Sequence, residues 1–357
     1  MNISFITGWT STQNISIFTS MKLGTIENIS GIKLGILGTH LGVLEALVPN
    51  EEGLLPRDKD GEFVVVSGTK KLLELSPVRV DLIQLLSFGN TLPSEKDALI
   101  ANLRELNIEP QLVMMVGGVN PMKPEDEDEA VEQLLHNINA AKRNHTTEIN
   151  STSIEPWMEG TPPSDENDFQ ERVTQNIKLH FRAFQEADLE NSCIKNWNLE
   201  FLRPGEFATF TSLKKIRPIL DGLNKKVGCP FFRALIDAAH CGDSGLSMAE
   251  NAQIISEMGA NDQIGPFHCS APTTRGCLSS DDGWVSALLR ANAETGKLPS
   301  VFVELFRHDD QAFAELRELV AGHGVDTTMG RTYIELVVDG LVDTVRRLNN
   351  LKNRGVI

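Results

Sequence analysis

Residues 231–240 read FFRALIDAAH, and the prediction of the fold starts from this segment. Its apolar first part is typical of a buried β-strand, and Asp237 stands where that strand would end. A carboxylate rarely stays buried at a strand end without a partner or a cation. The segment therefore predicts a strand that delivers a carboxylate to a functional site.

Three further segments repeat this design at intervals of about one strand and one helix. They are the apolar runs 196–201, 264–267 and 301–303, which carry Glu200, His268 and Glu304 at or near their ends. In a (β/α)₈ barrel, the carboxyl ends of all strands meet at one mouth, where these barrels carry their chemistry. We therefore predict that the three residues converge with Asp237 as a metal site.

The rest of the chain supplies the remaining units of such a barrel. Four more strand-like runs come first, at 32–37, 78–86, 111–116 and 148–154. Helical patterns follow most of the runs, at 94–106, 124–143, 164–189, 212–224, 247–258, 281–293 and 309–321. Strands that alternate with long helices indicate parallel βαβ units. We predict an α/β fold, a single (β/α)₈ barrel over residues 31–357.

The ends of the chain and its first crossover are less regular. Residues 1–30 are rich in Ser and Thr and poorly periodic, so we expect an N-terminal extension before the barrel. Residues 38–77 read as an insertion near the first helix, and loops of this length are usually lids or disordered. Residues 339–352 predict an amphipathic C-terminal helix that packs on the barrel or on a second subunit of a homo-oligomer.

Composition limits the partners and the compartment. The formal net charge of −16 would repel a phosphate backbone, so we expect no nucleic-acid partner. No stretch approaches the roughly 20 apolar residues that span a bilayer, so we expect no membrane partner. No basic region precedes a hydrophobic one at the N-terminus. The five cysteines form no Cys-x-x-Cys pair, which is typical of free thiols in a reducing, cytoplasmic compartment.

The predicted ligands favour a hard divalent cation. Three carboxylates and one imidazole favour Mn²⁺, Mg²⁺ or Co²⁺ over a metal that prefers thiolates. We expect one divalent ion, with Mn²⁺ first and Zn²⁺ as a further alternative. Cys241 and Cys269 each follow a predicted site histidine, but alternation along a strand turns them away from the metal. We expect these two cysteines to pack in the core.

The neighbours of the four ligands complete a known pattern. Glu206 lies six residues after the first ligand in NLEFLRPGEF, His240 lies three after the second in IDAAH, and Arg275 lies seven after the third in HCSAPTTRG. With these motifs, residues 195–310 resemble the xylose isomerase-like barrel superfamily, and most closely its ketose 3-epimerase branch. The resemblance implies one metal ion on the four ligands and sugar contacts from Glu206, His240 and Arg275. The spacing to Arg275 is one residue longer than this family usually has.

The resemblance also implies a reaction class. A sugar isomerase or epimerase would abstract a proton next to a metal-bound carbonyl and pass through an enediolate. Glu200 and Glu304 are the expected catalytic pair, since one could remove a proton and the other return it on the opposite face. Loss of a β-substituent from the same intermediate would instead make a lyase or dehydratase acting on a keto-sugar, keto-glycoside or inosose. The ligand set does not choose among these outcomes, and we expect a sugar or polyol substrate.

Two other functions are open to a barrel with this ligand set. Endonuclease IV carries a similar set but adds histidines after its second and third strands and an Asp-x-His pair after its seventh. Residues 87–90 and 116–120 contain no histidine, and Asp281-Asp282 is not followed by one, which disfavours a nuclease. A non-catalytic barrel that serves as a binding subunit is disfavoured because both candidate acid/base glutamates are present.

Overall fold

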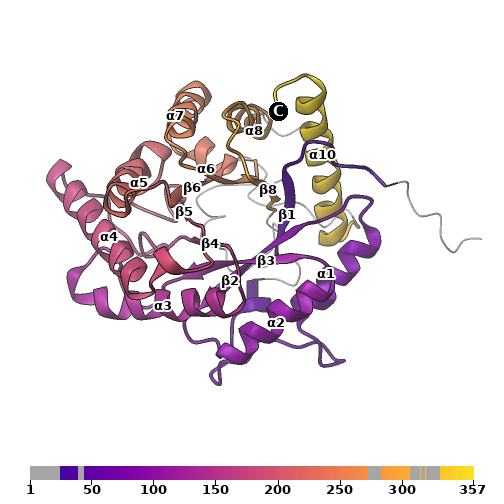
Figure 1. Cartoon of the computed structure of the whole chain (residues 1–357), viewed down its shortest axis with the longest axis horizontal. Coiled ribbons are helices and arrows are strands. Elements are labelled where there is room, and N and C mark those ends of the chain that lie inside the picture. Colours follow the sequence, from indigo (N-terminus) through magenta and orange to yellow (C-terminus); the bar gives the residue numbers. More distant parts are fainter. Residues whose placement is uncertain (1–24, 39–43, 272–282, 306–313, 315–317, 319–329) are drawn as a thin grey trace, which may run out of the picture.

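The computed structural model of the chain is a closed barrel of eight parallel strands surrounded by helices (Figure 1). It describes residues 25–38, 44–271, 283–305, 314, 318 and 330–357. The strands pair in sequence order, and the last strand closes on the first. The predicted (β/α)₈ barrel is therefore confirmed.

The strands lie close to the predicted ranges. They are β1 (Lys33–Leu37), β2 (Leu82–Phe88), β3 (Glu109–Met115), β4 (Glu148–Ser151), β5 (Asn196–Glu200), β6 (Phe232–Asp237), β7 (Ile264–Cys269) and β8 (Ser300–Val303). The clearest difference is in β2, which begins later than the predicted run at 78 because Val78 instead forms an isolated bridge with Ile26. The eight apolar runs of the sequence thus form the eight strands, in the same order.

The helices alternate with the strands around the outside of the barrel. They are α1 (Val64–Leu75), α2 (Pro93–Glu105), α3 (Glu127–Arg143), α4 (Glu166–Glu186), α5 (Leu213–Val227), α6 (Ala238–Asp243), α7 (Met248–Ala260), α8 (Trp284–Glu294) and α10 (Tyr333–Asn353). Short 3₁₀ turns cover Leu44–Leu47, Pro124–Asp126 and Leu189–Asn191. The predicted helix 309–321 falls almost wholly outside the described residues.

The first crossover differs from the prediction. We expected residues 38–77 to be an insertion, but the stretch contains the crossover helix α1. Its sequence, VVVSGTKKLLEL, combines β-branched residues with a glycine, which weakens the helical signal. Tertiary packing overrides that weakness, since Val65, Val66 and Leu72 are buried and α1 packs against α2 and α10. The prediction of an insertion was therefore wrong for the α1 part of the stretch.

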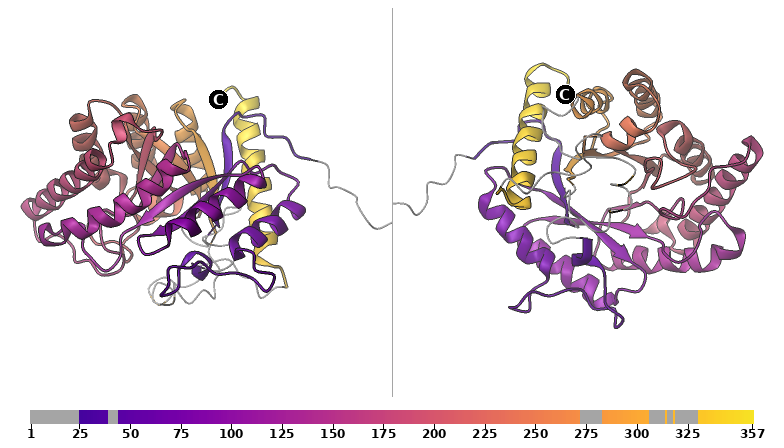
Figure 2. Two further views of the ribbon diagram at one scale, coloured as in Figure 1. Left: turned by 60° about the horizontal axis from the view of Figure 1, so that its bottom comes forward. Right: turned by 180° about the vertical axis from the view of Figure 1, so that it is seen from behind.

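Amphipathic helices build the outer layer of the core. In α5, Ser212 accepts a hydrogen bond from the backbone N–H of Lys215, and Gly228 ends the helix with a left-handed φ of 82°. The apolar face between these caps is buried against the barrel. The predicted C-terminal helix is present as α10, which packs against α1, α8 and β8 and completes the ring of helices (Figure 2). Packing on the barrel, the first of the two alternatives expected for this helix, is therefore present, and packing on a second subunit stays a prediction.

Amide side chains line part of the barrel interior. Asn198 donates to Asn150 at 2.9 Å, Asn150 donates to Gln111 at 3.2 Å, and Gln111 donates to Glu148 at 2.9 Å. A Cβ at Gly265 would lie 2.6 Å from the Asn198 side-chain oxygen, so the glycine leaves room for this chain of amides. Buried amides are stable when hydrogen-bonded, and these bonds join β3, β4 and β5 below the mouth.

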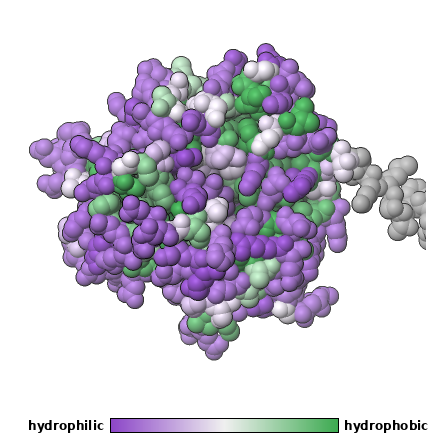
Figure 3. All heavy atoms as spheres, viewed as in Figure 1, coloured by the Kyte–Doolittle hydropathy of each residue, from purple (hydrophilic) through white to green (hydrophobic). Residues whose placement is uncertain are grey.

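The outer surface is mainly hydrophilic on the face shown in Figure 3. Among the described residues, the exposed large apolar side chains are Ile29, Val48, Leu54, Leu75, Leu92 and Trp157. Within that same part of the chain, every helix is too short or too polar to cross a membrane.

Candidate active site

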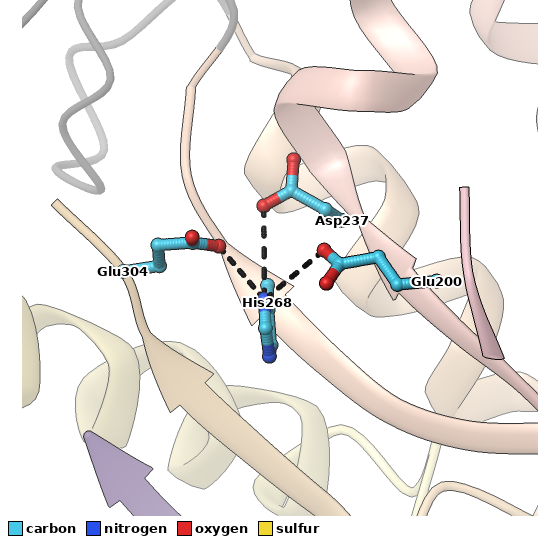
Figure 4. A group of neighbouring side chains, drawn as sticks. All are labelled: Glu200, Asp237, His268 and Glu304. Atoms are coloured by element: carbon cyan, nitrogen blue, oxygen red, sulfur yellow. Dashed lines mark hydrogen bonds and ion pairs between the residues drawn. The ribbon is translucent and has the colours of Figure 1, made fainter. Parts of the chain in front are cut away.

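Four side chains from consecutive strands meet at the carboxyl end of the barrel (Figure 4). Glu200 ends β5, Asp237 ends β6, His268 is the second-to-last residue of β7, and Glu304 directly follows β8. One ligand atom of each residue lies within 4.8 Å of those of the other three. Their exposed fractions run from 0% for Asp237 to 6% for the two glutamates. The structure therefore brings together the four residues that the sequence predicted as a set.

The imidazole of His268 lies at the centre of this cluster. Its Nδ1 atom is 2.7 Å from Glu304 Oε2, 3.6 Å from Glu200 Oε1 and 4.0 Å from Asp237 Oδ2 (Figure 4). The other ring nitrogen, Nε2, points away from the carboxylates and lies 2.8 Å from Oε1 of Gln84. One nitrogen of the ring thus faces the cluster, and the other faces the barrel interior.

The chemistry of the donors fits a divalent cation. Three buried carboxylates around one point repel one another, and a cation removes that cost. Burial lowers the pKa of His268 to about 4, although the negative charge of Asp237 acts in the opposite direction. The imidazole is therefore neutral near pH 7, which is the form that binds metals. Glu200, Asp237, His268 and Glu304 are the residues that could hold the ion.

The two cysteines beside the site histidines lie in the core. Cys241 and Cys269 are both fully buried. Burial raises the pKa of the Cys241 thiol well above its ordinary value and that of Cys269 to about 12, so both remain protonated. The prediction that they pack in the core is confirmed.

Helix α6 carries His240 into the site. Asp237 caps this helix, because its Oδ1 accepts a hydrogen bond of 2.7 Å from the backbone N–H of His240. The imidazole of His240 then lies between two carboxylates, with Nδ1 3.5 Å from Glu200 Oε1 and Nε2 3.6 Å from Glu206 Oε2. A helix of six residues is too short to show a periodic pattern, so α6 was not predicted. His240 connects the four-residue cluster to Glu206.

Arg203 is a site residue that sequence reasoning missed. Its side chain is 1% exposed, with Nε 3.3 Å from Glu206 Oε2 and Nη1 3.5 Å from Asp243 Oδ2. The guanidinium places a positive charge beside Glu206 and joins the β5 loop to α6. The available signal was its position in LRPGE, between two predicted site residues.

Glu155, which follows β4, was also missed. It is 3% exposed, and its carboxylate accepts hydrogen bonds of 2.8–2.9 Å from the backbone N–H groups of residues 208–210. In the same loop, the backbone N–H of Met158 donates to the carbonyl oxygen of Glu206 at 2.7 Å. A Cβ at Gly160 would lie 2.7 Å from Glu155 Oε1, so glycine leaves room for the carboxylate. The β4 loop therefore holds the segment that carries Glu206.

One predicted sugar contact cannot be placed. Arg275 lies in residues 272–282, outside the described residues, and so does the Asp281-Asp282 pair. Of the predicted substrate contacts, the structure therefore places Glu206 and His240 next to the cluster.

Solved structures of other proteins match this chain over most of its length. A D-allulose 3-epimerase from Methylomonas sp. is 14% identical with a TM-score of 0.65, and the match covers 91% of this chain and 100% of that one. A putative sugar phosphate isomerase/epimerase from Anabaena variabilis is 14% identical with a TM-score of 0.67, covering 90% and 99%. The chain shares the barrel fold of these structures. A zinc-bound structure of the IolI protein shares this fold, with 15% identity, a TM-score of 0.56 and coverage of 89% and 99%.

No protein-family model and no curated protein matches the sequence. Because a fold of this kind hosts many activities, the function has to be argued from the site.

Proposed function

We propose that the chain is a divalent-metal-dependent sugar isomerase or epimerase. The observation that carries this proposal is the buried cluster of Glu200, Asp237, His268 and Glu304 at the barrel mouth. Proteins named as a D-allulose 3-epimerase and an L-ribulose 3-epimerase share the fold, which supports a sugar as the substrate class.

The four residues would hold one divalent ion, with Mn²⁺ favoured by their oxygen-rich donor set. A cation held there would act as a Lewis acid toward a substrate carbonyl. Asp237 contributes negative charge at full burial, and His268 contributes a neutral nitrogen.

Glu200 and Glu304 are the proposed acid/base pair. They lie on opposite sides of His268 in Figure 4 and come from β5 and from the end of β8. A carboxylate has two oxygens, so one can face a cation while the second takes or gives a proton. If one glutamate removes a proton from carbon and the other returns one to the opposite face, the result is epimerisation. If the proton returns to the neighbouring carbon, the result is isomerisation.

Glu206 and His240 are the proposed contacts to substrate hydroxyl groups. Both are buried and both lie beside the cluster, with His240 between Glu200 and Glu206. Arg203 orients the Glu206 carboxylate through its guanidinium. Arg275 stays a proposed sugar contact that rests on the sequence resemblance alone.

Hydrogen exchange at carbon tests the proposal directly. The Mn²⁺-loaded protein would be incubated in deuterated water with a panel of ketoses, 3-keto-glycosides and inososes, and the products followed by NMR and mass spectrometry. We expect deuterium at the carbon next to the carbonyl, together with a new epimer or isomer. An eliminated product would identify the lyase or dehydratase alternative instead. Absence of exchange with every compound in a protein that binds Mn²⁺ would refute proton abstraction.

A further inference from the structure

Gln84 contacts the metal-site histidine from a strand of the other half of the barrel. It lies in the middle of β2 within an apolar run, LIQLLSF, and is 1% exposed. Its Oε1 is 2.8 Å from Nε2 of His268, while its own Nε2 has no hydrogen-bond partner among the described residues. A buried amide costs free energy unless it is hydrogen-bonded. Among the described residues, the bond to His268 is therefore the hydrogen bond that satisfies this amide.

The direction of this hydrogen bond decides the state of the imidazole. An amide oxygen only accepts, so Nε2 of His268 carries the hydrogen and donates it to Gln84. Without a cation, the 2.7 Å contact of Nδ1 with Glu304 Oε2 is a hydrogen bond that needs a hydrogen of its own. A neutral imidazole with its one hydrogen on Nε2 leaves a lone pair on Nδ1 for a cation. That lone pair faces Glu200, Asp237 and Glu304, as a metal ligand must.

We propose that Gln84 is a positioning residue that fixes the tautomer and the ring orientation of His268 for metal binding. This inference rests on the proposed metal-dependent function. Gln84 acts through His268, since its amide nitrogen donates to none of the three carboxylates.

The packing around the ring agrees with this role. Phe302 of β8 lies edge-on to His268, with ring centroids 5.8 Å apart. A Cβ at Gly35 of β1 would lie 2.3 Å from the Phe302 ring, so the glycine gives that ring its space. The imidazole is thus held by Gln84 at Nε2, by Glu304 at Nδ1 and by an aromatic contact beside the ring.

A neutral acceptor also suits the charge of the site. A carboxylate at position 84 would add a fourth negative group to the three that already surround the imidazole, and burial makes such charge costly. An amide supplies the acceptor without that charge. Glutamine therefore orients His268 and leaves it a neutral ligand.

The test uses metal affinity and a direct view of the imidazole hydrogen. Gln84→Met keeps the length of the side chain and removes the amide oxygen, whereas Gln84→Glu keeps an acceptor. Gln111→Met is the matched control, because Gln111 is the register partner of Gln84 on β3, is 4% exposed, and bonds to Glu148 and Asn150. Co²⁺ affinity would be measured by visible absorption. NMR of the Zn²⁺-loaded protein with ¹⁵N-labelled histidine would locate the ring hydrogen.

We expect Gln84→Met to weaken Co²⁺ binding by roughly 10-fold to 100-fold, the usual effect of losing an outer partner of a metal-binding histidine. Gln84→Glu should retain Co²⁺ binding to within about 10-fold of the unsubstituted protein and move the Nε2–H resonance downfield, since a carboxylate is the stronger acceptor. Gln111→Met should change the Co²⁺ affinity by less than about 3-fold, because its partners lie outside the cluster.

Two results would overturn the inference. One is a folded Gln84→Met protein that binds Co²⁺ like the unsubstituted protein. The other is a Gln84→Glu protein that loses Co²⁺ affinity by well over about 10-fold, the size of loss expected for Gln84→Met, and this result decides the matter if Gln84→Met does not fold. An unsubstituted protein that binds neither Co²⁺ nor Zn²⁺ would refute the proposed function as well, whereas normal metal binding in both Gln84 variants would refute only the role of Gln84.

Discussion

The two halves of the barrel share one architecture and differ in what their strand ends carry. In the second half, β5 to β8 deliver Glu200, Asp237, His268 and Glu304 to the mouth. In the first half, β1 to β4 end in the uncharged residues Leu37, Phe88, Met115 and Ser151. Glu155, the buried carboxylate that follows β4, is bonded to backbone N–H groups.

The difference shows how a symmetric fold can carry a one-sided site. Neighbouring strands lie roughly 4.8 Å apart, so consecutive strand ends bring their side chains close together. The curvature of the barrel then brings β5 and β8 within reach of one ion, which a flat sheet would not do. The first half supports this arrangement through contacts such as that of Gln84 with His268.

The largest expected effect comes from removing a charge from the second half. Asp237→Asn should weaken metal binding and abolish activity, because it removes a fully buried carboxylate while the amide can still cap α6. Metal content by atomic emission and deuterium exchange would measure the two losses. Glu148→Gln is the matched change in the first half and should keep the metal. Unchanged metal stoichiometry in both Asp237→Asn and His268→Ala would contradict the assignment of the ligands.

The next largest effect is expected for two variants in the second half that separate metal binding from proton transfer. Glu304→Gln and Glu200→Gln each keep an oxygen for the metal and lose the basic oxygen. We expect some metal binding to remain while turnover falls by at least ~10²-fold, the low end for loss of a general acid or base. Deuterium wash-in at carbon should disappear together with turnover. Normal turnover in both metal-loaded variants would exclude proton transfer by these glutamates.

Residues at the border of the cluster should affect the substrate and spare the metal. Glu206→Gln and His240→Ala should retain the ion and either raise KM or lower kcat, because the two side chains lie beside the ligand set. Metal analysis would show whether the ion is retained, and steady-state kinetics would show the change in KM or kcat. If either variant purifies without metal, the cluster is larger than four residues.

The first half can be tested through Glu155. Glu155→Gln should lower the free energy of unfolding by about 1–3 kcal/mol, the usual cost of leaving buried polar groups unpaired, and should raise KM through the loop that carries Glu206. Urea unfolding, KM and metal content would be compared with those of Glu159→Gln, an exposed carboxylate of the same loop. Unchanged stability and KM in Glu155→Gln would show that the hydrogen bonds between Glu155 and the backbone of residues 208–210 do not position Glu206.

The smallest effect concerns stability away from the mouth. Burial lowers the pKa of His180 to about 4, below the unfolded value of 6.5, so the unfolded chain takes up the proton first. The free energy of unfolding therefore keeps the full contribution of the neutral His180 above pH 6.5 and loses it as the pH falls toward 4. Between pH 7 and pH 5 the protein should therefore lose about 2 kcal/mol that His180→Leu does not lose. Urea unfolding at both pH values measures this, with exposed His145→Asn as the control, and equal losses in all three proteins would contradict it.

The order of the strands, the barrel class and the four candidate ligands could all be predicted from the sequence. Each of these depends on local pattern, because an apolar run that ends in a polar residue can be read within one βα unit. His240 and Glu206 were predicted for the same reason, since each lies within a few residues of a ligand. Local signals failed where an element was short or weakly helical, as in α6 and α1.

The side chains that support the site could be identified from the folded chain alone. Gln84 and His268 are 184 residues apart in the chain, and the closure of the barrel brings them within 2.8 Å. Glu155 meets the β5 loop and Arg203 meets α6 through contacts between different βα units. Local periodicity cannot predict such pairs, because the two residues of each pair lie in different βα units and become neighbours only when the barrel closes. The candidate metal ligands can thus be predicted from the sequence, whereas the contact that orients His268 depends on the closure of the barrel.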